Sequence, residues 1–437
     1  MKNPAASAVL VALAAVLAAP GTAAAGAVGE WNARAGTAAR LACISPANNP
    51  LHEARMYAIA HLAIHDALNA IDRRSRPYAF DAIAPPDASP EAAVAAAARD
   101  TLVALLAEIG FPFPPECAAA GIAYVEDEYA AAMGAIASGA AKDAGILAGQ
   151  AAAAAILLRR AGDNSDTALL DFAYPQGTAP GEYRFTPGQT FVFAPRWGEV
   201  TPFVLQSASQ YSASKPYRID SPQYTADYEE VRLYGSLTGS LRTADQTEIA
   251  HFWVESSPLL WNRVARDVAD TEGLDDWEQA RLFGLLNMAL ADGYVASWEN
   301  KYRYNFWRPV TAIQLGDDDG NPQTTGDPDW EPLVPTPPIP DHDSGHAVQG
   351  GAAAAVLALV LGSDAIPFST CSLTLPANTC DDASPTLRHF PSFSAAAAEN
   401  AVSRIYVGFH FRHAVEAGTE HGRKIGQRAV NLYLKPQ

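Results

Sequence analysis

The chain has 437 residues, of which 49% are hydrophobic and 18% charged, and its formal net charge is −18. This composition excludes a disordered or fibrous protein, and the length provides core for one large or two medium domains. The negative charge argues against nucleic acid and anionic membrane surfaces as partners. An anion site in this protein would therefore need a local cluster of positive charge.

The first 25 residues have the pattern of a secretory signal peptide. They carry Lys2, an apolar stretch from Val9 to Ala19 and a small-residue end, and they are too short to span a membrane. The later apolar runs are expected to be core helices, with no membrane span. We therefore predict an exported protein, periplasmic or secreted, with residues 1–25 as the signal peptide.

Four cysteines fit an oxidising compartment. Cys371 and Cys380 bracket a short loop, which favours a local disulfide, and Cys43 and Cys117 are available for a second. The sequence has no Cys-x-x-Cys pair, which argues against a zinc ribbon and against thioredoxin-like chemistry.

Helical periodicity dominates both halves of the chain. It predicts helices at about 51–73, 90–109, 118–138, 142–160, 224–237, 243–254, 261–270, 277–307, 392–407 and 415–434. Between the halves, Tyr, Pro, Gly and Phe recur without a period, which indicates a long ordered loop. We predict an all-α fold of two helical bundles in one domain, divided into 26–160, a connection at 161–225, and 226–437.

Two cations stand near the end of the predicted 277–307 helix. Lys301 and Arg308 are seven residues apart, which places them within roughly 20° of each other on a continuous helix. Both would then reach the same side, where an anion would relieve their repulsion. A solvated basic edge is the alternative, but the aromatic residues around them do not suit an open surface.

The stretch from Pro340 to Gly362 leads from prolines into an apolar helix. Ser344 and Gly345 stand where the first N–H groups of that helix lack partners, which is a favourable place for an anion. His346 would add or remove a proton beside it. A serine that only caps the helix is the alternative.

A third pair, Arg404 and His410, would lie about 120° apart on a continuous helix. Gly408 between them is therefore expected to break the helix and turn His410 inward. A core histidine without a ligand is the alternative.

Together, KYRYNFWRP, PIPDHDSGHA and SRIYVGFHFR resemble the three-part signature of the vanadium-dependent haloperoxidase and type 2 phosphatidic acid phosphatase superfamily. The phrases HLAIHDALNAID, LRTADQTEIAHFW and FPSFSAAA are similar to those of bacterial vanadium haloperoxidases, so the resemblance covers most of the chain. It implies the vanadium chloroperoxidase or acid phosphatase-like fold.

The resemblance also implies roles for individual residues. His410 would bond vanadium, or in a phosphatase attack phosphorus and carry a phosphohistidine, and His346 would be the acid–base group. Five groups would hold the oxygens of vanadate or phosphate: Lys301, Arg308, Arg404, the Ser344 hydroxyl and the Gly345 N–H.

The leading hypothesis is a vanadate-dependent haloperoxidase, whose partners are hydrogen peroxide, halide and a small organic acceptor. It depends on the resemblance of the whole chain, including the N-terminal bundle. An acid phosphatase acting through His410 and a non-catalytic oxyanion-binding protein are the alternatives. A homodimer is left open.

Three positions depart from the family pattern. Asp343 replaces the proline of the signature and would either orient His346 or oppose a bound anion. Ile339 stands where chloride-oxidising members tend to carry an aromatic residue, which leaves the halide preference open. Ala414 stands where the superfamily often has an Asp that orients the histidine, and we expect Glu416 or the backbone to substitute.

Other candidates have plainer explanations. His61 and His65 have metal-binding spacing, but an Ala/Leu helix favours packing or hydrogen bonding. The acidic run 317–319 resembles a calcium loop without its closing Glu, and we expect a solvated turn. Trp298 and Trp307 are expected to fill the core or line the approach to the site.

Overall fold

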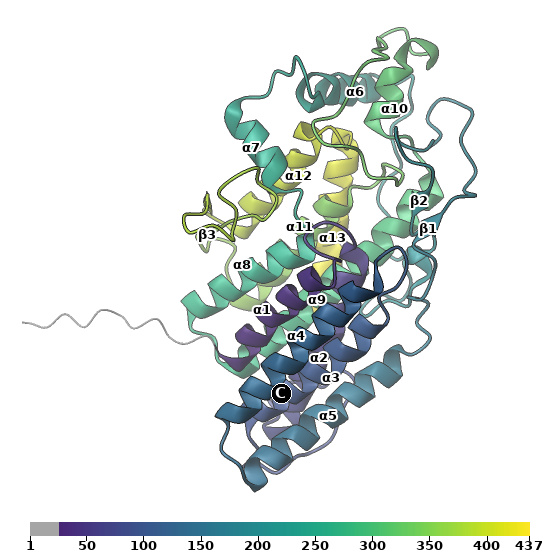
Figure 1. Ribbon diagram of the computed structural model, residues 1–437. Helices are drawn as coiled ribbons and strands as arrows, with labels where there is room; N and C mark the ends of the chain where they lie inside the picture. Colours follow the sequence, from purple (N-terminus) through teal and green to yellow (C-terminus); the bar gives the residue numbers. More distant parts are fainter. Residues whose placement is uncertain (1–25) are drawn as a thin grey trace, which may run out of the picture.

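The computed structural model describes residues 26–437, so the predicted signal peptide lies outside the described residues. These residues form a mostly helical molecule in which two sets of helices lie side by side (Figure 1). The all-α prediction is therefore confirmed, with only two short two-stranded sheets in the described part of the chain.

The N-terminal helices are α1 (Ala27–Leu41), α2 (Pro50–Ile71), α3 (Pro90–Ala107), α4 (Pro115–Ala135) and α5 (Ala140–Arg160). Proline begins α2, α3 and α4, where its fixed φ suits the first helical turn and its missing N–H costs nothing. The helix α1 was not predicted from the sequence.

Residues 161–221 follow with little regular structure. They contain β1 (Leu170–Asp171), which pairs antiparallel with β2 (Val192–Phe193), and the 3-10 helix η1 (Trp197–Glu199). Asp292 fixes the end of this connection to the C-terminal helices, since its buried carboxylate accepts the N–H groups of Phe203, Val204 and Leu205 at 2.6–2.8 Å. The prediction of an ordered loop is confirmed.

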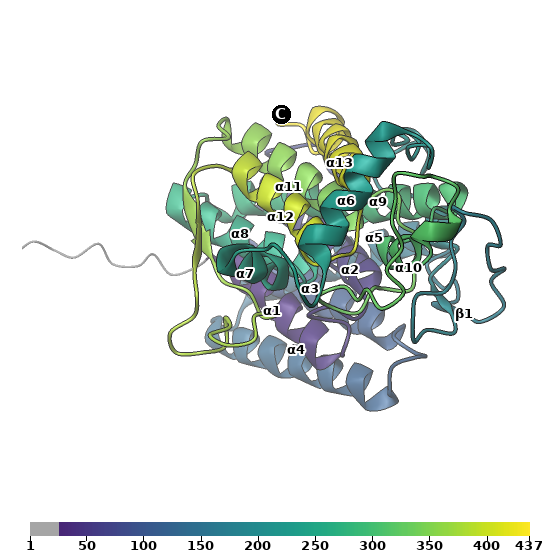
Figure 2. The same ribbon diagram turned by 90° about the horizontal axis from the view of Figure 1, so that it is seen from above.

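The C-terminal part starts with α6 (Pro222–Gly235), α7 (Ala244–Phe252), α8 (Ser257–Glu272), α9 (Asp276–Tyr304), α10 (Pro309–Gln314) and the 3-10 helix η2 (Gly316–Asp318). It continues with α11 (Gly345–Leu361), β3 (Phe368–Thr370), β4 (Arg388–Phe390), α12 (Phe393–Tyr406) and α13 (Arg412–Leu432). Seen from above, α11, α12 and α13 lie together, with α6 and α7 beside them (Figure 2).

The apolar helix α11 packs against α9, α12 and α13. Glycines let α13 approach closely: a Cβ at Gly422 would lie 1.8 Å from the Val348 carbonyl oxygen, and one at Gly418 would lie 2.8 Å from that of Ser344. These contacts fix the N-terminal end of α11, where the Ser344 turn lies.

One cluster of buried apolar side chains runs through both sets of helices, with α9 packed against α2 and α11. The two bundles therefore share a core. The boundaries 26–160, 161–225 and 226–437 stay predictions.

Among residues 26–437, α5 is long and apolar enough to cross a membrane by length and composition. The expectation that the later apolar runs are core helices therefore needs a packing argument for α5. The helix nevertheless packs along α3, where a Cβ at Gly149 would lie 2.3 Å from the Ala93 carbonyl oxygen. A core helix of a bundle passes the same test.

Both expected disulfides are present. Cys43 is bonded to Cys117 and Cys371 to Cys380. The first joins the end of α1 to α4, and the second closes the short loop between β3 and β4.

Candidate oxyanion site

Lys301 and Arg308 do not share a helix. The helix α9 ends at Tyr304, Asn305 has a left-handed φ of 46°, and Arg308 precedes α10. The predicted C-terminal end of the 277–307 helix and the argument from a common helical face are therefore wrong, whereas the body of the helix is confirmed. Asn tolerates this conformation better than most residues, and Pro309 disfavours a helical Arg308. The turn nonetheless brings both side chains to one cavity.

Ser344 lies immediately before α11, and Gly345 is its first residue. The Ser344 hydroxyl does not cap the helix: it is buried and has no hydrogen-bond partner. The first N–H groups of α11 have no acceptor within the helix. A buried hydroxyl without a partner costs free energy, so this turn suits a ligand that accepts hydrogen bonds.

The predicted break at Gly408 is present. The helix α12 ends at Tyr406, Gly408 has a φ of 85°, and α13 begins at Arg412. A Cβ at Gly408 would lie 2.7 Å from the Gly235 carbonyl oxygen, so both conformation and space require glycine. His410 consequently turns back toward Arg404, whose carbonyl oxygen accepts its N–H at 3.2 Å.

These three segments converge on one cavity of about 670 Å³. Six of the seven predicted site residues line it: Lys301, Arg308, Gly345, His346, Arg404 and His410. The seventh, Ser344, is fully buried next to Gly345. Residues distant in sequence are thus brought together as expected.

The Lys301 ammonium is held by the loop that precedes α11. Its Nζ donates to the carbonyl oxygens of Pro340, Asp341 and Asp343 at 3.2, 2.9 and 2.5 Å. Burial, followed by the charge of Arg308, lowers the pKa of Lys301 to about 7. A bound anion would favour the charged form, because it supplies the counter-charge that this buried site lacks.

The two arginines are fixed by backbone carbonyl groups. Arg308 donates to the oxygens of Ile339 and Phe409 at 2.6 and 2.9 Å, and Arg404 donates through Nη1 to Trp253 at 2.7 Å. Burial, followed by the charge of Arg308, lowers the pKa of Arg404 to about 9. The Nε of Arg404 is buried without a partner, and is therefore a free donor for an anion.

Asp341 orients His410. Its Oδ1 lies 2.8 Å from Nδ1 of His410, and the other ring nitrogen lies 3.0 Å from Nη1 of Arg308. Burial, with the positive charges of Arg308, Lys301 and Arg404, lowers the pKa of His410 well below its usual value. A neutral ring that donates through Nδ1 carries its lone pair on Nε2, which accepts a hydrogen bond from Arg308.

The expectation that Glu416 or the backbone would orient His410 is therefore wrong. The carboxylate of Glu416 lies 3.8 Å from Arg412 at the surface. Ala414 serves the site through its carbonyl group, which accepts the N–H of Ser344 at 3.0 Å. Sequence reasoning missed Asp341 because its partner is 69 residues away, although its place in PDHDSGH was a signal.

Asp343 does not contact His346, so the expected role in orienting that histidine is wrong, and its side chain does not line the cavity. Its buried carboxylate accepts from Ser297 and lies 2.7 Å from Nδ1 of His421, with Asn300 also in contact. Burial acts to raise its pKa, but the hydrogen bond and charge of His421, with His342 and Lys301, hold it at about 2. Asp343 anchors the loop that carries Ser344.

The segment that follows α7 holds the side chain of His346 in place. Its Nε2 lies 3.3 Å from the Glu255 carbonyl oxygen, in the same segment as the Trp253 carbonyl that holds Arg404. Burial, followed by the charge of Arg404, lowers the pKa of His346 well below its usual value. A neutral imidazole here can accept a proton from a group in the cavity.

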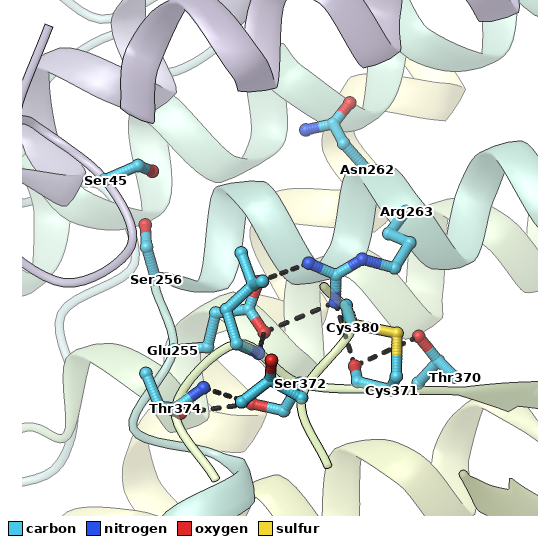
Figure 3. A network of polar contacts seen from close by, with 12 residues as sticks. Ser45, Glu255, Ser256, Asn262, Arg263, Thr370, Cys371, Ser372, Thr374 and Cys380 are labelled. Atoms are coloured by element: carbon cyan, nitrogen blue, oxygen red, sulfur yellow. Dashed lines mark hydrogen bonds and ion pairs between the residues drawn. A yellow bond between two sulfur atoms is a disulfide. The ribbon is translucent and has the colours of Figure 1, made fainter. Parts of the chain in front are cut away.

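A polar network fixes this segment (Figure 3). The carboxylate of Glu255 forms a 2.5 Å ion pair with Arg263 and accepts the N–H of Leu373 at 2.9 Å. Arg263 also donates to the Cys371 carbonyl oxygen at 2.8 Å, in the loop closed by the Cys371–Cys380 disulfide. This support joins three separate segments of the chain, and no motif or spacing in the sequence indicates it.

The other candidates have structural roles. His61 contacts Asn32, whereas His65 contacts Asp66 and Ser75, and no group of three His, Cys, Asp or Glu side chains in residues 26–437 is arranged for a metal ion. Asp319 accepts from Asn321 and Thr324 within its turn. Of the two tryptophans, Trp298 lines the cavity and Trp307 fills the core.

The cavity fits a small oxyanion. It offers three cationic side chains, two of them with fixed guanidinium planes, and a buried hydroxyl and a buried Arg404 Nε that lack partners. The nearest carboxylates, Asp341 and Asp343, are turned toward His410 and His421. Positive charge therefore exceeds negative charge locally, in spite of the net charge of the chain.

Fold and site thus define an all-α protein with a buried cationic oxyanion cavity. Residues 281–436 match the family model described as the VCPO second helical-bundle domain. The chain is therefore similar to vanadium chloroperoxidase in its C-terminal part, and its fold is that of the bacterial vanadium-dependent haloperoxidases compared below.

Among curated relatives, vanadium chloroperoxidase of Curvularia inaequalis is 26% identical in an alignment of 292 residues, and the match covers 52% of this chain and 47% of that protein. The match thus spans about half the length of that relative. The crystal structure of the first bacterial vanadium-dependent iodoperoxidase has a TM-score of 0.73 at 24% identity, covering 93% of this chain and 95% of that one. An apo-type bacterial vanadium-dependent chloroperoxidase has a TM-score of 0.69 at 15% identity, covering 88% and 94%.

Replacement of Asp341 by Asn tests its role as the orienter of His410. The amide can donate to Nδ1, which favours the tautomer protonated at Nε2 and removes the lone pair that faces Arg308. We expect vanadate affinity to fall roughly 10- to 100-fold, measured by titration with vanadate. Asp319→Asn, in a buried turn outside the cavity, is the control. Unchanged affinity in Asp341→Asn would contradict this role.

Proposed function

We propose that this protein is a vanadate-dependent haloperoxidase that oxidises halide with hydrogen peroxide. The observation that supports it best is the convergence of Lys301, Arg308 and Arg404 with the unpartnered Ser344 hydroxyl and the oriented His410. The relatives named above are vanadium chloro- and iodoperoxidases, which favours the same reaction class.

In this proposal the three cations, the Ser344 hydroxyl and the Gly345 N–H hold vanadate, and Nε2 of His410 is its protein ligand. Bound vanadate would act as the Lewis acid that activates peroxide toward halide. Asp341 keeps the Nδ1 proton on His410. His346, held by the Glu255 carbonyl group, removes or returns a proton at the reacting oxygen.

A phosphatase is the second candidate, since the same donors suit phosphate and Nε2 of a neutral His410 suits a nucleophile. The two reactions are separated by adding vanadate and measuring bromide-dependent halogenation of a phenol dye, against phosphate release from a nitrophenyl ester. Halogenation without phosphate release supports the haloperoxidase. Phosphate release alone contradicts it, and silence in both assays supports a non-catalytic oxyanion-binding protein.

We also propose that the protein is exported and acts in the periplasm or outside the cell. The pattern of residues 1–25 and the two disulfides support this proposal. Detection of the protein in the periplasmic or culture fraction, cleaved near residue 25, tests it. Full-length protein retained in the cytoplasm would contradict it.

Anion affinity is expected to depend on pH through Lys301. With a pKa of about 7 in the anion-free protein, Lys301 is charged below pH 7 and loses its proton as the pH rises above it. Vanadate affinity should therefore fall above pH 7, by up to about tenfold per pH unit. Titration at pH 6, 7, 8 and 9 measures it.

Lys301→Arg is the matched control, because arginine stays charged over this range. The ratio of wild-type to variant affinity removes the ionisation of vanadate itself, and this ratio should fall with rising pH. A constant ratio from pH 6 to 9 would contradict the role given to the Lys301 ammonium.

A further inference from the structure

The cavity is much larger than an oxyanion requires. Its volume is about 670 Å³, whereas four or five atoms the size of a water oxygen need roughly 150 Å³ at about 30 Å³ each. Cavities of several hundred Å³ are typical of sites for small organic ligands. The remaining space therefore needs an occupant other than the anion.

The space beyond the cationic residues has an apolar wall. Four separate parts of the chain build it: the turn at 47–50, the turn at 112–113, the connection through Leu170, Phe191 and Phe193, and the segment 334–339. Proline is frequent in this wall, at positions 50, 112, 335, 337 and 338. Since proline fixes φ, much of the wall is rigid and preformed.

The charges of the lining select against ionic occupants. No Asp or Glu side chain of the described residues lines the cavity, while Lys301, Arg308 and Arg404 do. An organic cation would be repelled, and an organic anion would compete with the oxyanion. Only a few uncharged polar groups are available: Asn48, Gln189 and the hydroxyl of Tyr294, which is buried without a hydrogen-bond partner.

We propose that this cavity binds the organic acceptor, an uncharged aromatic compound with a small polar group, such as a phenol. The inference rests on the proposed haloperoxidase function and adds a binding site for the molecule that becomes halogenated. The bound acceptor lies in the same cavity as His346 and His410. Halogen transfer then takes place inside the protein.

The overall reaction is balanced as RH + X⁻ + H₂O₂ + H⁺ → RX + 2 H₂O. The halide loses two electrons, and peroxide accepts them as its O–O bond breaks. A C–X bond replaces the C–H bond of the acceptor, and the proton released from carbon ends in water.

Direct binding of 2-naphthol to the vanadate-free protein, by calorimetry, tests the site without any turnover. Ala47→Trp fills the exposed edge of the cavity, and Phe191→Ala removes a ring from its wall. Each is expected to raise the dissociation constant of 2-naphthol roughly tenfold. Ala135→Trp, exposed at the end of α4 and outside the cavity, should bind as the wild type does.

The kinetic counterpart compares two reactions of the vanadate-loaded protein. Both cavity variants should raise the KM for 2-naphthol roughly tenfold and leave the oxidation of iodide to triiodide, which needs no organic acceptor, within about twofold. Equal KM values for 2-naphthol in the wild type and both variants would overturn the proposal.

The two proposals fail separately. If 2-naphthol binds with the predicted variant effects but no halide is oxidised, the cavity site stands and the haloperoxidase function fails. If halide is oxidised but 2-naphthol shows no binding up to millimolar concentration, the proposed function stands and this inference is wrong.

Discussion

His346→Ala is expected to lower turnover roughly 10²- to 10⁴-fold, the range for loss of a general acid–base group, while vanadate affinity stays within a few-fold of wild type. The histidine lines the cavity, but burial and Arg404 keep it neutral, so its removal takes no positive charge from the anion site. The measurement pairs bromide oxidation at saturating vanadate with a vanadate titration.

The control for this prediction is His389→Ala, because His389 is exposed on β4 and contacts Ser369 outside the cavity. The His389→Ala variant should have the same turnover and the same vanadate affinity as the wild type. Unaltered turnover in His346→Ala would remove His346 from the acid–base role. If His346→Ala also lost vanadate affinity, His346 would mainly support the structure of the oxyanion site.

Asp343→Asn is expected to cause the largest loss of stability, roughly 3–5 kcal/mol at pH 7, as for a buried pair that loses one partner. The carboxylate is fully buried and contacts Ser297, Asn300 and His421, so an amide would place a donor against a donor. Denaturant unfolding of both proteins measures the difference.

The pH dependence gives this prediction a second readout. The pKa of Asp343 falls from 3.8 to about 2 on folding, so its contribution is present above about pH 4 and is lost as the pH falls toward 2. The difference in unfolding free energy between the wild type and Asp343→Asn should therefore decrease as the pH falls from about 4 toward 2. Asp220→Asn, in an exposed pair with Arg218, should cost less than about 1 kcal/mol. A difference in unfolding free energy that stays constant from pH 7 to pH 3 would contradict this account of Asp343.

The residues of the oxyanion site could be located from short motifs, because each motif has its own local conformational requirement. Gly408 needs a left-handed conformation, and Ser344 with Gly345 begins an apolar helix. The reasoning about Lys301 and Arg308 failed because the helix ends three residues after Lys301, at a left-handed Asn305. Periodicity defines the body of a helix better than its end.

The supports of the site were not predictable from the sequence, because they are tertiary contacts between distant segments. Asp341 reaches His410, Asp343 reaches His421, and the Glu255 carbonyl group reaches His346. None of these pairs has a characteristic spacing. The apolar wall of the cavity likewise draws on the aperiodic connection between the bundles, which the sequence showed only as an ordered loop.

Lys301, Arg308 and Arg404 together bind one oxyanion, and this is the central claim. Its most direct measurement is calorimetric titration of vanadate into wild type and Arg404→Met at pH 6.5. We predict one site per wild-type chain, competition by phosphate, and roughly 10- to 100-fold weaker binding in the variant, since the charge of Arg404 and the charge-assisted hydrogen bond from its free Nε would be lost. Equal affinity in the two proteins, or no binding site in the wild type, would contradict the account.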